Sequence, residues 1–248
     1  MEQNGRLATP EGREIAWRRI SGEGPGIVFL YGLRSDMGGT KAEWLAGWAA
    51  ARGRAFLRFD VSGHGASSGT FEAGCIGDWA ADARAAIAAL TEGPQLIVGS
   101  SMGGWLALLL ARDMPERVAG LVTIAAAPDF TEDGMWAGMS PDRRAELLRE
   151  GRVEEPSNYG PPLVITRRLI EDGRDHLVLR RPLALPFPAR FLHGTADADV
   201  PCDWGLRLLA HVTGEDVRLT LVKGADHRFS APAELELIGR MVAEVAPG

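Results

Sequence analysis

Residues 95–109 read QLIVGSSMGGWLALL. The stretch begins with an apolar run, continues with a serine framed by glycines, and ends with a second apolar run. A G-x-S-x-G pattern between a strand and a helix is typical of a sharp turn that holds a nucleophilic serine clear of a sheet. Such a turn strains its central residue, and side chains two positions away would collide, which explains Gly99 and Gly103. The pattern predicts that Ser101 is the nucleophile. Ser100 is the alternative serine, but the glycines frame Ser101.

Further apolar runs, many bounded by glycine, occur on both sides of this turn. Continuous apolar strands of this kind indicate a mostly parallel sheet covered by helices on both faces, the α/β class. The expected strands are 6–9, 14–20, 26–30, 55–59, 95–98, 118–124, 189–192 and 217–222. Helical spacing of apolar residues predicts helices at 41–52, 78–90 and 232–245.

This alternation of strands and helices is interrupted after residue 128. Between 129 and 186 the sequence predicts helices at 141–150 and 163–172 but no strand, and several prolines break the pattern. We interpret residues 129–186 as a helical cap inserted over one end of the sheet. Residues 1–128 and 187–248 then form the α/β core.

Composition excludes several classes of function. The 248 residues carry a formal net charge of −6 without a basic stripe, so no nucleic-acid partner is expected. No run approaches the roughly 20 apolar residues that span a bilayer, and no secretory signal is recognisable. Two cysteines form neither a disulfide framework nor a metal-binding pair. We expect a cytoplasmic protein without a membrane span.

A serine nucleophile needs a base and an acid that orients the base. In hydrolases built on this turn, the acid and then the histidine follow the serine along the chain, each after a late strand. Asp197 follows the strand predicted at 189–192, and His227 follows the strand predicted at 217–222. Asp199 is the alternative acid, whereas Asp226 adjoins the histidine and cannot easily turn back onto its ring. The sequence thus predicts a triad of Ser101, Asp197 and His227.

The other four histidines are in less suitable places. His211 and His176 fit solvated positions on a surface helix and in the cap. His193 ends a strand and is interpreted as structural, while His64 lies in a loop from which it could brace the site. His227 alone has the position that a general base needs.

The negative oxygen of a tetrahedral intermediate needs preorganised hydrogen-bond donors. We expect the backbone N–H groups of Met102, which follows the nucleophile, and of Leu33, in the glycine-rich loop after the strand at 26–30. That loop lacks the phosphate-binding patterns GxGxxG and GKS/GKT, so no nucleotide is expected.

Four stretches narrow the interpretation further: GLRSDMGGTKA (32–42), RFDVSGHG (58–65), VGSSMGGW (98–105) and DHR (226–228). With them the sequence resembles α/β-hydrolases over essentially its whole length. It is most similar to the α/β-hydrolase domain-containing subfamily that includes a mitochondrial palmitoyl-protein thioesterase, also described as an acyl-glucuronide esterase. The resemblance implies an α/β-hydrolase fold with a mostly parallel eight-stranded sheet, and a Ser101–Asp197–His227 triad. It also implies a small-molecule acyl ester or thioester, or an acylated protein, as substrate, with no cofactor or metal.

Apolar cap residues are candidates for an acyl pocket, and the alternative is that they only bury the cap against the sheet. From this set, Met135, Trp136, Met139, Tyr159, Leu163 and Ile165, we predict Trp136 and Tyr159 to contact substrate. Cap arginines either attract a substrate carboxylate or form a solvated face; they are Arg167, Arg168, Arg174, Arg180 and Arg181. The predicted activity is that of a carboxylesterase or thioesterase. Two alternatives stay open: the same triad cleaving a carbon–carbon bond or forming peracids, and a non-catalytic binding protein.

Overall fold

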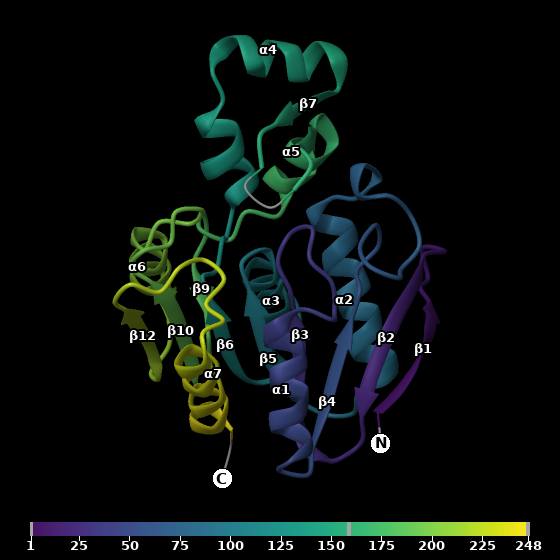
Figure 1. Cartoon of the computed structure of the whole chain (residues 1–248), viewed down its shortest axis with the longest axis vertical. Coiled ribbons are helices and arrows are strands. Elements are labelled where there is room, and N and C mark those ends of the chain that lie inside the picture. The colour runs from purple at the N-terminus through teal and green to yellow at the C-terminus, as the bar shows by residue number, and fades with distance from the viewer. Residues whose placement is uncertain (1, 158–159, 247–248) are drawn as a thin grey trace.

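The computed structural model describes residues 2–157 and 160–246, and its main feature is a single eight-stranded sheet (Figure 1). The strand order is β1-β2-β4-β3-β5-β6-β10-β12. The first two pairings, β1 with β2 and β2 with β4, are antiparallel, and the rest are parallel, which confirms the predicted mostly parallel sheet. The strands are β1 (Glu2–Ala8), β2 (Glu14–Ile20), β3 (Glu23–Leu30), β4 (Arg54–Phe59), β5 (Gln95–Ser100), β6 (Val118–Ile124), β10 (Ala189–Gly194) and β12 (Val217–Val222).

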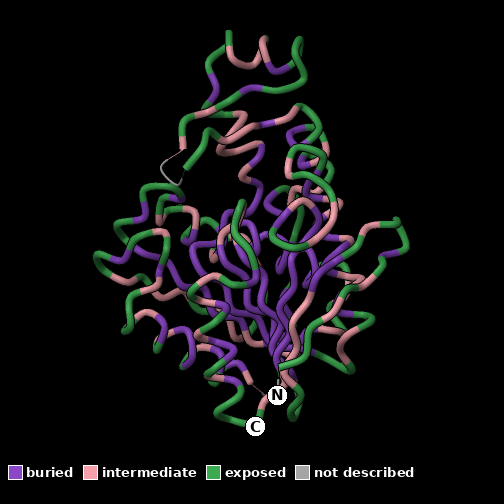
Figure 2. The backbone as a smooth tube through the Cα atoms, turned by 45° about the vertical axis from the view of Figure 1, so that its right-hand side comes forward, coloured by how far each residue is buried: buried purple, intermediate pink, exposed green. Residues whose placement is uncertain are grey.

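Helices cover both faces of this sheet. Those of the core are α1 (Thr40–Ala50), α2 (Ile76–Leu90), α3 (Met102–Asp113), α6 (Asp203–His211) and α7 (Pro232–Val245), with short turns η1 (Phe71–Ala73) and η2 (Pro115–Arg117). Helix α1 packs beside α7, and α2 packs beside α3 (Figure 1). The central strands are consequently buried along their length, as the purple tube of Figure 2 shows, and every residue of β5 and β10 is buried. This double burial is why these strands read as continuous apolar runs rather than as alternating patterns.

The cap segment, residues 129–186, departs from the prediction that it holds no strand. It contains η3 (Thr131–Trp136), α4 (Pro141–Glu150), β7 (Arg152–Glu155), β8 (Leu163–Thr166), α5 (Arg167–Asp175) and β9 (Leu183–Ala184). Strands β7 and β8 form an antiparallel pair in which Val153 lies opposite Ile165. Both side chains bury into a small cap cluster with Met139, Leu147 and Ile170. Four-residue strands with one buried face carry too few apolar residues to stand out in the sequence.

The helix predicted at 163–172 starts too early, because its first four residues are one of these short strands. Leu163–Thr166 is strand β8, and α5 begins at Arg167, after Thr166 caps the helix by accepting a hydrogen bond from the Leu169 amide at 3.1 Å. The β-branched residues Val164 and Ile165 favour the extended chain.

The C-terminal part of the predicted cap returns to the core before residue 186. Val178, Leu179, Leu183 and Leu185 belong to the main core cluster, and β9 pairs with the core strand β11 (Val212–Thr213). Above the sheet in Figure 1, α4, β7 and α5 form the separate part. Within the described ranges, no helix has the length and apolarity needed to cross a membrane.

Candidate active site

Ser101 occupies the turn between β5 and α3 in a strained backbone conformation, with φ 55° and ψ −119°. A Cβ at Gly99 would lie 2.3 Å from the carbonyl oxygen of Gly103, and a Cβ at Gly103 would lie 2.2 Å from that of Leu30. Only glycine therefore fits at these two positions, as the sequence pattern predicts. The Ser101 amide donates to the Ile124 carbonyl at 2.9 Å, which fixes the turn against β6.

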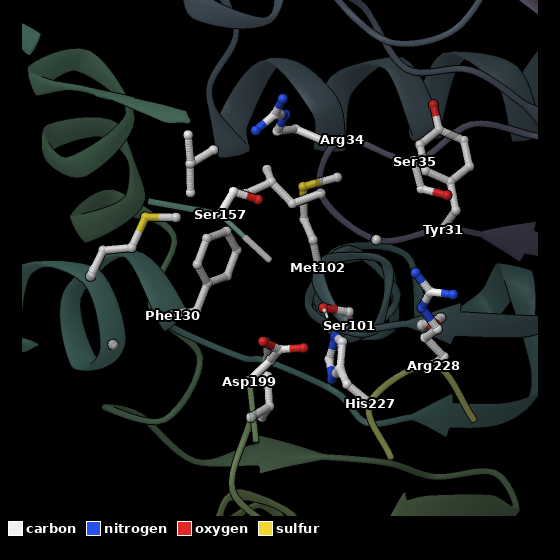
Figure 3. A pocket seen from close by; sticks show the side chains of 18 of the residues that line it. Tyr31, Arg34, Ser35, Ser101, Met102, Phe130, Ser157, Asp199, His227 and Arg228 are labelled. Carbon is white, nitrogen blue, oxygen red and sulfur yellow. Dashed lines mark hydrogen bonds between the residues drawn. The ribbon is translucent and has the colours of Figure 1, made fainter. Parts of the chain in front are cut away.

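His227 lies in the loop after β12 and faces Ser101 across the carboxyl ends of the strands (Figure 3). Its Nε2 is 3.1 Å from Ser101 Oγ, and its Nδ1 is 2.8 Å from Asp197 Oδ2. An ionised carboxylate only accepts hydrogen bonds, so Nδ1 carries the ring proton and Nε2 is left to accept from the serine hydroxyl. The structure thus brings together the three residues that the sequence singles out.

Asp197 lies in the loop after β10, with a fully buried side chain. Its Oδ1 accepts hydrogen bonds from the Val200 amide at 2.8 Å and the Asp199 amide at 3.0 Å. Burial alone would raise its pKa, but bonds from His193, His227 and the Val200 amide outweigh burial and hold the pKa of Asp197 well below its usual range. The carboxylate therefore stays ionised wherever the chain is folded near neutral pH.

His193, interpreted from the sequence as structural, braces this acid. Its Nε2 lies 2.8 Å from the Val200 carbonyl oxygen and 3.5 Å from Asp197 Oδ2. Gly205 of α6 packs so closely that a Cβ there would lie 3.0 Å from His193 Nδ1. A sequence reading could find His193 as a buried polar residue at a strand end, but could not show its contact with Asp197.

The loop after β3 passes directly behind the serine. A Cβ at Gly32 would lie 3.1 Å from Ser101 Cβ, so the glycine permits the close approach. Leu33 and Met102 both line the cavity that contains Ser101. Met102 is the first residue of α3, where an amide has no partner within the helix and the helix dipole favours an anion.

His64 braces the loop of residues 31–39, named the oxyanion loop for its predicted donor Leu33. Its Nε2 accepts from the Arg34 amide at 3.2 Å, and its Nδ1 lies 3.2 Å from the Ser62 carbonyl oxygen. The rings of Tyr31, Phe71 and Trp79 surround it, and burial lowers its pKa, so the neutral ring is favoured. The bracing role considered from the sequence is therefore the one His64 has.

Asp60 is a second brace, and sequence reasoning assigned it no role. Its buried carboxylate accepts from the Met37 amide at 2.7 Å and the Ala66 amide at 2.8 Å, joining the oxyanion loop to the loop of His64. The available signal was an acid directly after a buried apolar strand, in the stretch DVSGHG.

A cavity of about 1080 Å³ opens above the triad between the core loops and the cap. Its apolar wall from the cap comprises Phe130, Met135, Met139, Leu163 and Ile165. Trp136 is not among the described residues that line it, contrary to the prediction. Its ring packs instead against the guanidinium groups of Arg144 and Arg174, with the ring centroid 5.1 and 4.7 Å away. Tyr159 lies outside the described residues.

The cap arginines form ion pairs rather than a substrate-facing cluster. Arg167 pairs with Glu171, Arg168 with Asp78, Arg174 with Glu132, and Arg180 with Asp129 and Asp133. None of the arginines proposed from the sequence is among the described cavity residues. The solvated-face interpretation holds for the paired four.

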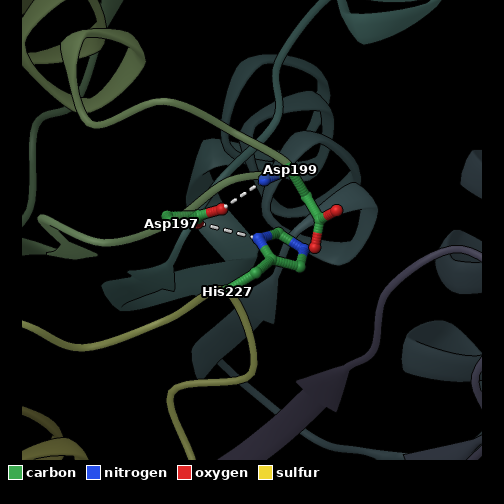
Figure 4. A group of neighbouring side chains, drawn as sticks. All are labelled: Asp197, Asp199 and His227. Atoms are coloured by element: carbon green, nitrogen blue, oxygen red, sulfur yellow. Dashed lines mark hydrogen bonds and ion pairs between the residues drawn. The ribbon is translucent and has the colours of Figure 1, made fainter. Parts of the chain in front are cut away.

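Asp199, the alternative acid, lies beside His227 on the cavity side (Figure 4). Asp197, Asp199 and His227 offer ligand atoms within 4.8 Å of one another. The hydrogen bond between Asp197 Oδ2 and His227 Nδ1 already uses two of the available ligand atoms, so the cluster by itself does not indicate a metal site.

A serine on a strained turn at the carboxyl edge of a mostly parallel sheet, facing a histidine and an acid from later loops, defines the α/β-hydrolase class. The chain belongs to the alpha/beta hydrolase fold family, whose model matches residues 27–153, and it is a hydrolase of that family. Its relatives include the mitochondrial palmitoyl-protein thioesterase ABHD10 of Rattus norvegicus, 35% identical over 234 residues that cover 94% of this chain and 78% of the relative. The resemblance predicted from the four sequence stretches is confirmed.

Solved structures agree with this placement. A putative hydrolase from Agrobacterium vitis S4 superposes with a TM-score of 0.94 at 38% identity, over 100% of both chains. Mouse alpha/beta hydrolase domain-containing protein 10 superposes with a TM-score of 0.90 at 32% identity, over 98% of this chain and 97% of that one.

Proposed function

We propose that this hydrolase cleaves carboxylic esters or thioesters through a covalent acyl-enzyme on Ser101. The observation that carries the proposal is the continuous hydrogen-bonded path Ser101–His227–Asp197, with contacts of 3.1 and 2.8 Å. A base within hydrogen-bond reach of a hydroxyl, itself oriented by a third group, is the arrangement that activates a serine.

The reaction proceeds in two halves. Ser101 Oγ attacks the acyl carbonyl carbon while His227 Nε2 takes the hydroxyl proton. The bond from the acyl carbon to the leaving oxygen or sulfur then breaks, and His227 returns the proton to that leaving group. A water molecule, deprotonated by His227, attacks the acyl carbon of the acyl-enzyme. The bond from that carbon to Ser101 Oγ then breaks, His227 returns the proton to Oγ, and the carboxylic acid leaves.

The negative oxygen of each tetrahedral intermediate is stabilised by the backbone N–H groups of Leu33 and Met102. Support comes from the close approach of Gly32 to Ser101 and from the position of Met102 at the N-terminus of α3. Donors fixed before the reaction need no reorganisation as the charge develops.

The acyl chain lies against the apolar cap wall of the cavity. Phe130, Met135, Met139, Leu163 and Ile165 supply this wall, and a volume of about 1080 Å³ leaves room for a long chain. The relatives are named palmitoyl-protein thioesterases, which agrees with a long acyl group in a thioester. The acyl group is carried by a small molecule or by a protein, and substrates of both kinds distinguish the two. A cytoplasmic location stays a prediction.

The first test is Ser101→Ala with a p-nitrophenyl ester and a fluorophosphonate probe. We expect a loss of kcat of at least about 10⁴-fold and complete loss of labelling, with an unchanged circular dichroism spectrum. Ser100→Ala is the matched control and should keep both signals. Labelling that persists in Ser101→Ala would reject the proposed nucleophile.

The second test is a chain-length series offered as oxygen esters, as acyl-thioesters of a small thiol and as an S-acylated peptide. We expect kcat/KM to rise with chain length in each series. A preference for acetyl over all longer chains would contradict the acyl site.

A further inference from the structure

Lys41 is an unusual residue in this chain. Of 27 basic residues only two are lysines, Lys41 and Lys223. Lys41 belongs to the stretch 32–42, one of the four that carry the resemblance, and the proposed mechanism gives it no part. It is the second residue of α1, directly after the oxyanion loop, and it lines the active-site cavity.

The position is electrostatically unfavourable for a cation. The N-terminus of a helix carries a positive partial charge, so an ammonium in the first turn is repelled. Burial lowers the pKa of Lys41 to about 8, and Arg228 adds to the lowering, while Asp226 and Glu234 only partly offset it. A lysine at this place therefore costs stability, which points to a role other than stabilising the fold.

Lys41 makes one contact that suggests this role. Its Nζ donates a hydrogen bond to the carbonyl oxygen of Arg228, the residue after His227. The side chain thereby connects the helix that follows the oxyanion loop with the loop that carries the base.

The loop of His227 also has contacts with the loop after β10 and with α7. The Gly224 amide donates to Thr195 Oγ1 at 2.9 Å, and the Ala231 amide donates to Glu234 at 2.8 Å. Between these points Phe229 has a strained φ of 47°. A strained loop needs surrounding contacts to hold it, and Lys41 supplies one from the side of the oxyanion loop.

We propose that Lys41 is a positioning residue whose ammonium holds the His227 loop in register with the oxyanion loop. The inference rests on the proposed function of Ser101 and His227. A small displacement of the base relative to the serine is enough to slow the chemical step by about 100-fold, whereas it changes substrate binding little. The ammonium donates a stronger hydrogen bond than the neutral amine, so the bond from Lys41 to the Arg228 carbonyl weakens as Lys41 deprotonates.

The pH dependence follows from the groups that face the ammonium, Asp226 and Glu234 as acids and Arg228 as a base. Because the pKa of Lys41 falls from 10.5 to about 8 on folding, the folded chain binds fewer protons than the unfolded chain between these values. Its cost to stability is present below pH 8 and is relieved as pH rises toward 10.5. Removing the charge should then leave the unfolding temperature at pH 7 unchanged or higher.

The test compares Lys41→Met and Lys41→Arg with the control Lys223→Met. Lys223 is exposed and directly follows β12, at the start of the loop that carries His227. The readouts are the fluorophosphonate labelling rate of Ser101 and ester turnover between pH 6 and 10, with unfolding temperatures. We expect Lys41→Met to lower kcat and labelling about 10- to 100-fold with KM within about threefold and no loss of unfolding temperature. The wild type and Lys223→Met should lose rate through an apparent pKa near 8, and Lys41→Arg should recover most of the rate without that loss.

Two results would overturn the inference: a Lys41→Met rate equal to wild type, or a loss of rate matched by a lower unfolding temperature. A wild type that the probe does not label would be a different failure, because it would remove the proposed function of Ser101 itself.

Discussion

Different interactions stabilise the core and the cap, although residues of both line the same cavity. The core rests on one large cluster of buried apolar side chains on the two faces of the sheet. The cap has its own small cluster of five buried residues, and much of its outer surface consists of arginine–carboxylate pairs. Exposed pairs of this kind contribute little to stability, about 0–1 kcal/mol each.

This difference suggests a division of roles, in which core residues carry out the chemical step and cap residues select the substrate. The proposed triad and oxyanion residues lie on core loops and at the start of α3, where hydrogen bonds to groups such as Asp60 and His64 fix the backbone. The apolar wall that we expect to face the acyl chain comes from the cap. Substitutions in the core should therefore change kcat for all substrates alike, and substitutions in the cap should change the ranking of substrates.

The largest effect that sharpens this comparison is expected at the triad acid. Asp197→Asn should lower kcat by about 10⁴-fold for every acyl chain, because the amide presents the wrong hydrogen-bonding partner to His227 Nδ1. Asp199→Asn, a matched change two residues along, should cost less than about tenfold. Steady-state kinetics with a short and a long ester measure both. Equal losses in the two variants would show that the acid has been misassigned.

The low pKa of the Asp197 carboxylate predicts how the stability of the chain depends on pH. Because its pKa lies well below the usual range, it stays ionised as pH falls, and its stabilising contribution is lost only when pH drops through that low folded value. Between pH 7 and 5 the Asp197 carboxylate should therefore stay ionised and keep its contribution to stability. The unfolding temperature of the wild type relative to that of Asp197→Asn should change little over this range, and a fall in that difference would contradict the low pKa of Asp197.

The sequence predicts the core strands and the turn at Ser101 well because both depend on local signals. The glycines around Ser101 follow from sterics within five residues, and the buried strands carry unbroken apolar runs. The cap gives weaker signals: β7 reads RVEE, with one buried residue, Val153. Trp136 was expected to contact substrate because it is an aromatic residue of the cap. Its ring packs instead against Arg144 and Arg174, which come from two other helices. Long-range partners of this kind cannot be read from the sequence.

A moderate effect is expected at His64, a core residue that does not reach the cavity. His64→Phe keeps a ring among Tyr31, Phe71 and Trp79 but removes the acceptor for the Arg34 amide. We expect kcat to fall about 10- to 100-fold for short and long esters equally, because the oxyanion loop loses its brace.

The control is His211→Phe on α6, where the half-buried ring contacts only the Arg181 carbonyl among its described hydrogen-bond partners. It should keep full activity. A His64→Phe variant with a selective loss for long chains would break the division between core and cap.

The smallest effect is expected on the cap wall. Leu163→Ala removes part of the surface that we expect the acyl chain to contact, at a cost of about 1–2 kcal/mol for a long chain. The kcat/KM for a sixteen-carbon thioester should then fall about tenfold, whereas that for an acetyl ester should stay within about twofold. Leu148→Ala on α4 is the matched control, because that side chain is 48% exposed and does not line the cavity among the described residues. If Leu163→Ala instead slowed both substrates equally, the cap would act on the chemical step, and selectivity would have to come from the core loops.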